Sequence, residues 1–249
     1  MCSMNELRKK NINLLKKNNI YSENQEHDAC GVGLVVSTEG KKSRKVVEYG
    51  IEALKAVWHR GAVDADGKTG DGAGIHIEIP QDFFVEKIQN TGHTHDNTDV
   101  CVGMIFLPRN NYPAQENCRT IVESVLTKSN FNIYGWRQVP VNPKVLGEKA
   151  EITRPEIAQV LFKHNNKSVS GKVLEVKLYE ARRKIEKEAT NNNLNSFYIC
   201  SFSSKSIVYK GMFLAEALSD FYPDLQDTRF TSRFAIFHQR FQQIQHLVG

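Results

Sequence analysis

The chain has 249 residues, of which 40% are hydrophobic and 24% are charged, and its formal net charge is +5. This length allows one large domain or two small ones, and the composition excludes a collagen-like or wholly disordered chain. No run approaches 18 consecutive apolar residues, so we expect no membrane span. Basic residues are scattered among nearly as many acids, and we interpret the two densest basic runs, at 8–10 and 182–184, as solvated surface and not as a nucleic-acid site.

Five cysteines lie far apart, at positions 2, 30, 101, 118 and 200. Their number is odd, no pair has Cys-x-x-Cys spacing, and no secretory signal precedes them. This usage favours free thiols in a reducing compartment, which predicts a cytoplasmic protein. Cys101 and Cys200 lie within apolar runs, where a buried and inert thiol is expected.

Residues 1–29 are polar and rich in Asn and Lys, and we interpret them as a leader or propeptide. The acids within this segment argue against an organelle transit peptide, because such peptides avoid acidic residues. An apolar strand is predicted at 32–36. A helix should follow, with Ser43 as its N-cap and an apolar face that runs from 47 to 58. Gly61 is expected to end that helix in the left-handed conformation.

The remaining pattern alternates between strands and helices and indicates an α+β domain. We expect a glycine-rich loop at 69–74, a strand at 75–79, a helix from 80 or 81, a strand at 100–107 buried on both faces, a helix at 113–128, a strand at 131–140, an irregular stretch at 141–156, a helix with its apolar face at 174–185, and a strand pair at 197–202 and 206–209.

Cys30 is the sharpest chemical candidate, since it stands with Gly31 at the start of a strand directly after the polar leader. A cysteine acts as a nucleophile only when a base removes its proton. If the chain is cut before Cys30, its own α-amine, with an ordinary pKa of about 7.7–8.0, can serve as that base. Gly31, which has no Cβ, would let the backbone approach a substrate.

Other arrangements around a cysteine stay open. His27 and Asp28 are near Cys30 in sequence, but strand geometry need not aim either side chain at the thiol. Cys2 would become the first residue if Met1 were removed, although it lacks a strand that would hold it rigidly. The pattern around Cys30 could also reflect packing alone. A generic cysteine hydrolase with an internal histidine is a further hypothesis.

Three more features could bind ligands. Arg60, at the end of the predicted helix, could hold a carboxylate with two hydrogen bonds, or could simply complement the helix dipole. The glycine-rich loop at 69–74 suggests phosphate binding. It lacks the Lys-Ser/Thr ending of a P-loop and leads into a strand instead of a helix, so the pattern argues against a phosphate site. The polar stretch 93–96 contains two histidines and an aspartate, but no further metal ligand has sensible spacing, so we expect a polar loop and no metal site.

Six ordered motifs resemble those of one family. They are Asp28-Ala29-Cys30-Gly31-Val32-Gly33, Trp58-His59-Arg60-Gly61-Ala62, Thr69-Gly70-Asp71-Gly72-Ala73-Gly74, Ile79-Pro80-Gln81-Asp82-Phe83-Phe84, Gly135-Trp136-Arg137-Gln138-Val139-Pro140-Val141 and Ser232-Arg233-Phe234-Ala235-Ile236-Phe237-His238-Gln239-Arg240-Phe241. Together they resemble the amino-terminal glutaminase domain of the glutamate synthase large subunit, a class II glutamine amidotransferase.

The resemblance implies an N-terminal-nucleophile hydrolase fold, an αββα sandwich, and removal of a propeptide to free Cys30. The thiolate of Cys30 would attack the side-chain amide of glutamine, form a γ-glutamyl thioester and release ammonia for glutamate biosynthesis. By the same resemblance, Gly31, Arg60 and Arg240 would contribute to the substrate site, Arg240 by binding the α-carboxylate.

The chain departs from the family after Phe241. The family continues with a Ser-Thr-Asn-Thr stretch and an oxyanion-hole Asn-Gly pair, whereas residues 242–249 are a divergent tail. We therefore expect a leader at 1–29, a partial amidotransferase domain at 30–241, and an unburied sheet edge that makes folding marginal. A catalytically inactive fragment is the alternative, since loss of even one oxyanion donor costs about 10²–10³-fold in kcat.

Cofactors and protein partners are implied only for other parts of the full-length enzyme. The resemblance places FMN and an iron–sulfur cluster in domains that follow the glutaminase domain, and we expect no cofactor and no metal in this chain. Expected partners are glutamine, the remaining synthase domains and a small NAD(P)H-oxidising subunit.

Overall fold

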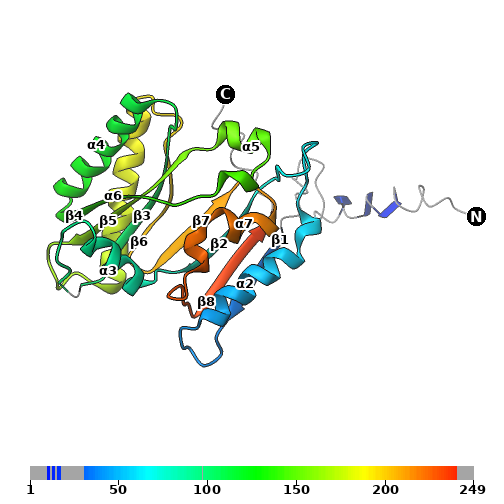
Figure 1. Ribbon diagram of the computed structural model, residues 1–249, viewed down its shortest axis with the longest axis horizontal. Helices are drawn as coiled ribbons and strands as arrows, with labels where there is room; N and C mark the ends of the chain where they lie inside the picture. The colour runs from blue at the N-terminus through cyan, green and yellow to red at the C-terminus, as the bar shows by residue number, and fades with distance from the viewer. Residues whose placement is uncertain (1–9, 12, 15, 18–30, 97, 240–249) are drawn as a thin grey trace, which may run out of the picture.

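The computed structural model describes residues 10, 11, 13, 14, 16, 17, 31–96 and 98–239, and these residues form an α+β structure with two four-stranded antiparallel sheets (Figure 1). The elements are β1 (Gly31–Val36), α2 (Arg44–Ala56), η1 (Trp58–Arg60), β2 (Ala73–Glu78), α3 (Gln81–Gln89), β3 (Cys101–Leu107), α4 (Tyr112–Lys128), β4 (Phe131–Gln138), η2 (Pro143–Val145), α5 (Glu148–Thr153), β5 (Glu156–His164), α6 (Gly171–Asn191), β6 (Tyr198–Ser203), β7 (Ser206–Gly211), η3 (Ala215–Ala217), α7 (Leu218–Phe221), η4 (Pro223–Gln226) and β8 (Phe234–Gln239).

The first sheet has the order β1-β8-β2-β7, so the last strand of the sequence lies between the first two. Its register pairs Val36 with Phe234 at one end and Gly31 with Gln239 at the other. Helix α2 packs on the buried face of this sheet, where Gly50 approaches Ala235 so closely that a Cβ on Gly50 would lie 2.6 Å from the Ala235 Cβ. The predicted strand at 32–36 and the cap at Ser43, whose hydroxyl accepts from the Lys45 amide, are confirmed.

The second sheet has the order β4-β5-β3-β6 and is covered on one face by α4 and α6, which lie side by side in Figure 1. The predicted apolar face of α6 is confirmed, because Leu174, Leu178, Ala181 and Ile185 are all buried against this sheet. All seven residues of β3 are buried, as expected for a strand that is covered on both sides. Among the described helices, none combines the length and the apolar character needed to cross a bilayer.

The sequence patterns misplace the end of the first long helix. Helix α2 stops at Ala56 and a 3-10 turn follows, which rotates Trp58 out of the apolar face and leaves it 60% exposed. Gly61 has φ −96° and is extended, so the expectation of a left-handed C-terminal glycine is wrong.

Two further expectations need correction. The stretch at 141–156, expected to be irregular, contains the short helix α5. The buried strand β5, which begins at the end of this stretch, was not predicted from the sequence. The strands at 198–203 and 206–211 exist, but they are not partners in one sheet: β6 pairs with β3, and β7 pairs with β2. Their short connection therefore passes from one sheet to the other.

A polar cluster links β4, β5 and β7 to the segment before β8. The Arg137 guanidinium donates to both carboxylate oxygens of Asp224, at 2.7 and 2.8 Å, and to Oε1 of Gln159. The Tyr209 hydroxyl completes the cluster by donating to Asp224 and accepting from Gln159. Burial and the neighbouring Asp224 carboxylate hold the pKa of Tyr209 well above its usual value, so it remains a neutral donor. This cluster connects the two sheets.

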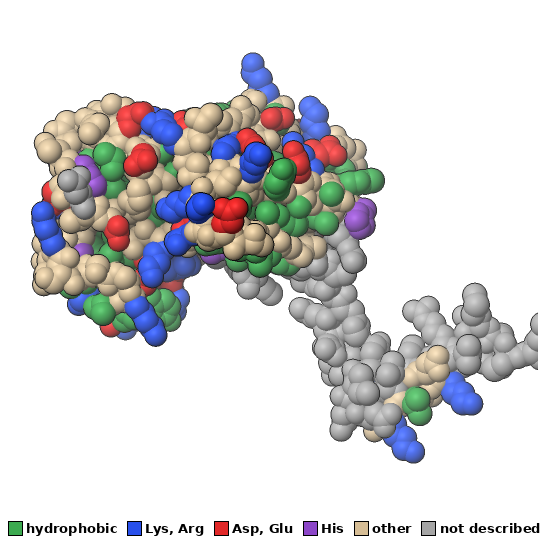
Figure 2. All heavy atoms as spheres, turned by 90° about the horizontal axis from the view of Figure 1, so that it is seen from below, with side chains coloured by type: hydrophobic (Ala, Val, Ile, Leu, Met, Phe, Trp, Pro, Cys, Tyr) green, Lys and Arg blue, Asp and Glu red, His purple; other side chains and the backbone are tan. Residues whose placement is uncertain are grey.

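One face of the first sheet is open at its β1 edge. Successive side chains of a strand alternate between faces, and the outward-pointing residues here are apolar and exposed: Val32, Leu34 and Val36 of β1, with Ile236 of β8. Figure 2 shows exposed apolar side chains on the half of the molecule that carries β1. Among the described strands β1 lies at the edge of its sheet, and an edge strand with an exposed apolar face favours self-association.

We predict that Leu34→Lys reduces self-association and changes the free energy of unfolding by no more than about 0.5 kcal/mol, because Leu34 is 61% exposed. Light scattering and urea denaturation measure the two effects. The matched control is Val35→Lys on the opposite face of the strand, where the side chain packs against the core. That control should be destabilised by more than about 1 kcal/mol. Equal effects of the two substitutions would contradict the assignment of an open face.

We further predict that Asp224→Asn lowers the free energy of unfolding by about 3–5 kcal/mol, since it leaves the Arg137 guanidinium buried without its counter-charge. Denaturation monitored by circular dichroism provides the measurement. The double variant Arg137→Met/Asp224→Asn should recover part of this loss, because it removes the unpaired charge. A loss below about 1 kcal/mol in the single variant would show that the pair does not hold the sheets together.

Candidate active site

The starts of β1 and β2 and the end of β8 meet at one end of the first sheet. Gln239, the last residue of β8, faces Gly31 on one side and Ala73 on the other. Gly31 is buried, as are Ala73 and Gln239. The register thus brings together segments that are about 200 residues apart in the sequence.

Two of the candidate residues from the sequence lie outside the described residues. Cys30 immediately precedes Gly31, and Arg240 immediately follows Gln239. Consecutive Cα atoms are about 3.8 Å apart, so each candidate is attached to one member of a directly facing pair. Arg60 is the last residue of η1, and its side chain also lies outside what the structure describes. Gly31 is the candidate whose position is fully described.

Gly61 brings the turn after Arg60 against the end of β8. A Cβ on Gly61 would lie 2.1 Å from Nε2 of Gln239 and 3.0 Å from its amide carbon. A side chain at this position would force the side chain of Gln239 to move, so the glycine permits a close approach between the two segments. The contact therefore joins the sequence neighbours of two candidate residues: Gly61 follows Arg60, and Gln239 precedes Arg240.

The chain after Gly61 is tied to the glycine-rich loop. Ala62 donates its amide to the Asp71 carboxylate at 3.0 Å and accepts from the Asp71 amide at 3.2 Å, and Val63 forms a bridge with Gly70. The loop then enters β2 beside the end of β8. Three of the sequence motifs, those around Gly31, Gly61 and Asp71, therefore converge on the end of β8.

Asp66 organises the turn between these paired segments. Its carboxylate accepts from the amides of Lys68 and Thr69 and from the Thr69 hydroxyl. These hydrogen bonds, the one from the Thr69 hydroxyl first, lower the pKa of Asp66 to about 2. A Cβ on Gly147 would lie 2.2 Å from the same carboxylate, so the start of α5 also packs closely against this turn.

Gln239 is the residue of this site that the sequence analysis did not identify as functional. Its side chain is only 1% exposed, and neither amide atom has a hydrogen-bond partner among the described residues. The signal was present in the alternation of β8, where the buried positions are Ala235, Phe237 and Gln239. A side-chain amide on the buried face of a strand normally has a hydrogen-bond partner, so its lack of one among the described residues is unusual.

The other described cysteines do not suit a nucleophile. Cys101, Cys118 and Cys200 are free and buried, as expected for the first and last of them. Burial raises the pKa of the Cys118 thiol to about 11 and that of Cys200 to about 12, and it raises the pKa of Cys101 further still. A thiol with so high a pKa is almost entirely protonated at neutral pH and is a poor nucleophile.

The polar stretch at 93–96 is engaged in contacts of its own. The Asp96 carboxylate binds Lys163 at 2.7 Å and Lys167 at 3.3 Å, and hydrogen bonds from Lys163 and Thr98 hold its pKa below the usual range. His95 interacts through Nε2 with the Thr98 carbonyl. Within the described parts of the chain, no group of three His, Cys, Asp or Glu side chains is arranged to hold a metal ion.

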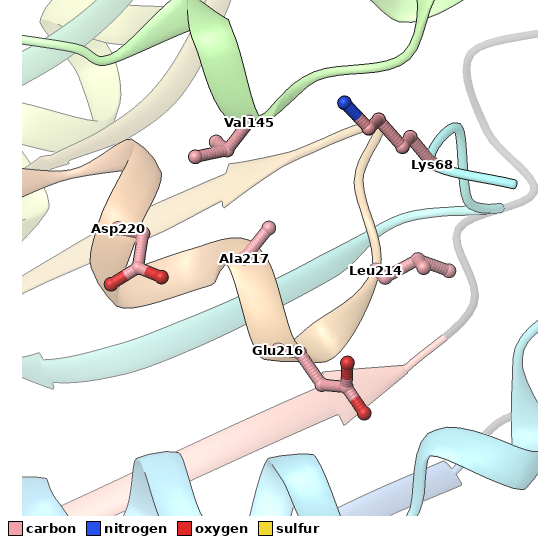
Figure 3. A pocket seen from close by; sticks show the side chains of 6 residues that line it. All are labelled: Lys68, Val145, Leu214, Glu216, Ala217 and Asp220. Carbon is pink, nitrogen blue, oxygen red and sulfur yellow. The ribbon is translucent and has the colours of Figure 1, made fainter.

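A hollow of about 200 Å³ lies beside the Asp66 turn, between the loop that carries Lys68 and the segment from η3 to α7 (Figure 3). Its charged side chains are Lys68, Glu216 and Asp220, and the rest of its wall is apolar. It contains no nucleophile and none of the candidate residues from the sequence. The candidate active site is therefore the end of the first sheet and not this hollow.

Comparison with known proteins identifies the family to which the chain belongs. The family described as "Glutamine amidotransferases class-II" matches residues 30–244. The chain belongs to this family of class II glutamine amidotransferases, and the family resemblance inferred from the motifs is confirmed.

Particular relatives narrow the assignment within the family. The chain is 57% identical over 223 residues to the NADPH glutamate synthase large chain of Azospirillum brasilense, which covers 90% of this chain and 15% of that one. It is 40% identical over 238 residues to the ferredoxin-dependent glutamate synthase of Pyropia yezoensis, covering 94% and 15%. It is 39% identical over 219 residues to the chloroplastic enzyme of Spinacia oleracea, covering 87% and 13%. The chain thus spans about 15% of the length of the curated relatives it matches.

We predict that the Asp66 turn loses stability only when the pH is lowered. Because the folded pKa is lowered from 3.8 to about 2, the carboxylate stabilises the turn fully above about pH 4 and loses this effect as the pH falls through 2. The NMR shift of the Thr69 amide proton should titrate with a midpoint near pH 2, and Asp66→Asn should abolish that titration. A midpoint near 3.8 would mean that the hydrogen bonds do not persist in solution.

Proposed function

We propose that this chain is the glutamine-hydrolysing part of a glutamate synthase, with Cys30 as its nucleophile. After cleavage before Cys30, the thiol proton passes to the α-amine and the sulfur bonds to the side-chain amide carbon of glutamine. The amine returns the proton to the departing nitrogen, which leaves as ammonia, and a γ-glutamyl thioester remains. Water then hydrolyses the thioester to glutamate and restores the thiol.

The single observation that supports this proposal best is the register of β8. It sets Gly31 opposite Gln239, and these are the neighbours of the proposed nucleophile and of the proposed carboxylate-binding arginine. A permanent guanidinium charge on Arg240 suits the α-carboxylate of glutamine, and Arg60 lies in the segment that Gly61 brings to the same place. The similarity to glutamate synthases over about 90% of the chain favours glutamine as the substrate.

The fold proposed for the complete domain is the N-terminal-nucleophile hydrolase sandwich of two sheets between helical layers. The two antiparallel sheets, with α2 on one and α4 and α6 on the other, support it.

The domain limits at 29/30 and 241/242 and the cytoplasmic location stay predictions. The relatives from plants are named as chloroplastic proteins.

Cofactors and protein partners belong to the same set of proposals. Iron–sulfur clusters are held by several cysteine thiolates, and the described cysteines are separately buried and form no such group, so the described residues do not fit a cluster. We propose that electron transfer involves other parts of a full-length synthase and a small NAD(P)H-oxidising subunit. The relatives' names specify NADPH in one case and ferredoxin in others.

The test is ammonia release from glutamine by the full chain. Cys30→Ala should reduce the rate by more than about 10³-fold, because no other group replaces the nucleophile. The matched control is Cys118→Ala, which removes a buried thiol far from the proposed chemistry and should leave the rate unchanged. Mass spectrometry of the purified chain should show that it begins at Cys30.

Three results would overturn parts of this proposal. Ammonia release that survives Cys30→Ala would exclude Cys30 as the nucleophile. An intact leader on a chain that hydrolyses glutamine would exclude the α-amine as the base. A folded and correctly cleaved chain that releases no ammonia would favour the alternative, a catalytically inactive part of the same enzyme.

A further inference from the structure

Residues 62–71 form a short hairpin between η1 and β2. Three pairs of residues face each other across it: Ala62 and Asp71, Val63 and Gly70, and Asp64 and Thr69. Gly67, with φ +71°, lies in the turn that joins the two sides, and its amide donates to the Asp64 carbonyl at 2.9 Å. The hairpin therefore keeps its shape through hydrogen bonds of its own.

Asp71 binds both backbone polar groups of Ala62. Its carboxylate oxygen Oδ2 accepts from the Ala62 amide at 3.0 Å, and its own amide donates to the Ala62 carbonyl at 3.2 Å. In an antiparallel pair, the first of these bonds ordinarily ends on a backbone carbonyl. A carboxylate in that place forms a charge-assisted hydrogen bond, which is stronger than one between neutral groups. Asp71 thus fixes the position of Ala62 more firmly than backbone pairing alone.

Asp71 is itself attached to a rigid part of the fold. It is followed by Gly72, whose φ of +123° favours glycine, and then by Ala73, the first residue of β2. Ala73 is buried and faces Gln239 on one side and Gly211 on the other. The Asp71 side chain therefore extends from the start of a central strand.

Ala62 in turn fixes the segment that carries Arg60. The Gly61 amide donates to the Trp58 carbonyl at 3.1 Å, which closes η1. Gly61 also lies directly beside the Gln239 amide. The backbone of Arg60 is therefore held between a 3-10 turn and the end of β8, next to the hairpin. A guanidinium that binds a carboxylate with two hydrogen bonds tolerates little displacement of its backbone.

We propose that Asp71 is a positioning residue that, through Ala62, holds the backbone of Arg60 at the end of β8. This inference rests on the proposed function, because it takes Arg60 as part of the glutamine site. Asp71 acts through the backbone of residues 60–62 and makes no contact with glutamine. Without its carboxylate, Ala62 keeps only the hydrogen bond to its carbonyl, and the arginine loses the fixed geometry that a carboxylate ligand requires.

The experiment measures KM and kcat for ammonia release from glutamine by the matured full chain. NMR signals of the Gly61 amide and of the Gln239 side-chain amide report the position of the turn without any turnover. Asp71→Ala removes the acceptor for the Ala62 amide. Asp71→Asn keeps an acceptor oxygen at the same distance along the side chain, so it should restore the contact.

The matched control is Asp64→Ala, which removes another carboxylate from the same hairpin. The Asp64 carboxylate binds Lys149 at 2.7 Å and accepts from the Ala65 amide at 2.6 Å. Its removal therefore leaves the contact between Ala62 and Asp71 in place.

We expect Asp71→Ala to raise the KM for glutamine about tenfold and to lower kcat by less than about threefold, because displacement of the arginine weakens binding of substrate and transition state alike. Asp71→Asn and Asp64→Ala should stay within about twofold of the unaltered KM, and the two NMR signals should shift in Asp71→Ala alone. In a chain that already carries Arg60→Ala, adding Asp71→Ala should change KM by less than about twofold, because its effect passes through Arg60.

An unchanged KM in Asp71→Ala would overturn the inference, as would an equal rise in Asp64→Ala. A further rise of about tenfold when Asp71→Ala is added to Arg60→Ala would assign the effect to a different residue and overturn it as well. A lower kcat at an unaltered KM would indicate a general loss of active chain, with the same consequence. Asp71→Ser, whose acceptor is shorter, replaces Asp71→Ala if that variant does not fold. A chain that releases no ammonia refutes the proposed activity, and the two NMR signals then decide whether Asp71 holds the turn.

Discussion

The antiparallel pairing of β8 with both β1 and β2 is the interaction on which the rest of this structure depends. β8 is formed near the end of the described chain and inserts between strands that begin at residues 31 and 73. Without it, β1 has no partner in the sheet and the segments around Gly31 and Gly61 have no common surface. The close contacts of Gly50 with Ala235 and of Gly61 with Gln239 show that helix α2 and the turn after it are also fitted to this strand.

The second sheet has a different role, which is to anchor the first. The charged pair between Arg137 and Asp224, with Gln159 and Tyr209, holds the segment that leads into β8 against β4 and β5. Charges inside a protein are tolerated when they are paired and hydrogen-bonded, and here both carboxylate oxygens of Asp224 accept from the Arg137 guanidinium. The motif around Trp136 and Arg137, which the sequence analysis could use only as a family signature, thus has a structural explanation.

Much of the fold could be predicted from the sequence, because hydrophobic periodicity reports burial directly. The apolar strand at 32–36, the capped start of α2 and the apolar face of α6 follow from local patterns, whereas the exposure of every second apolar residue of β1 does not. The errors arise where tertiary contacts decide. Trp58 continues the helical spacing, yet the helix ends before it. The connection between β6 and β7 resembles a hairpin in sequence, while their hydrogen bonds go to different sheets.

For the candidate site, too, the sequence indicates the types of residue and not the contacts between them. The types of residue at 30, 31, 60 and 240 indicated the chemistry, and the family motifs indicated their roles, but no local pattern could show that Gly31 faces Gln239. The sequence position of Gly61 suggests a left-handed helix end, whereas in the structure Gly61 is extended and lies directly beside the Gln239 amide. The sequence does not mark Gln239 as functional, because the burial of this polar side chain is known only from the structure.

The position of β8 also imposes an order of events during synthesis. Residues 31–36 leave the ribosome early, but the strand that they join in the sheet ends at residue 239. At about 5–20 residues per second, the nascent chain grows for roughly 10–40 seconds before that partner exists. Any self-processing that requires the assembled end of this sheet is therefore delayed until nearly the whole of the described chain has been translated.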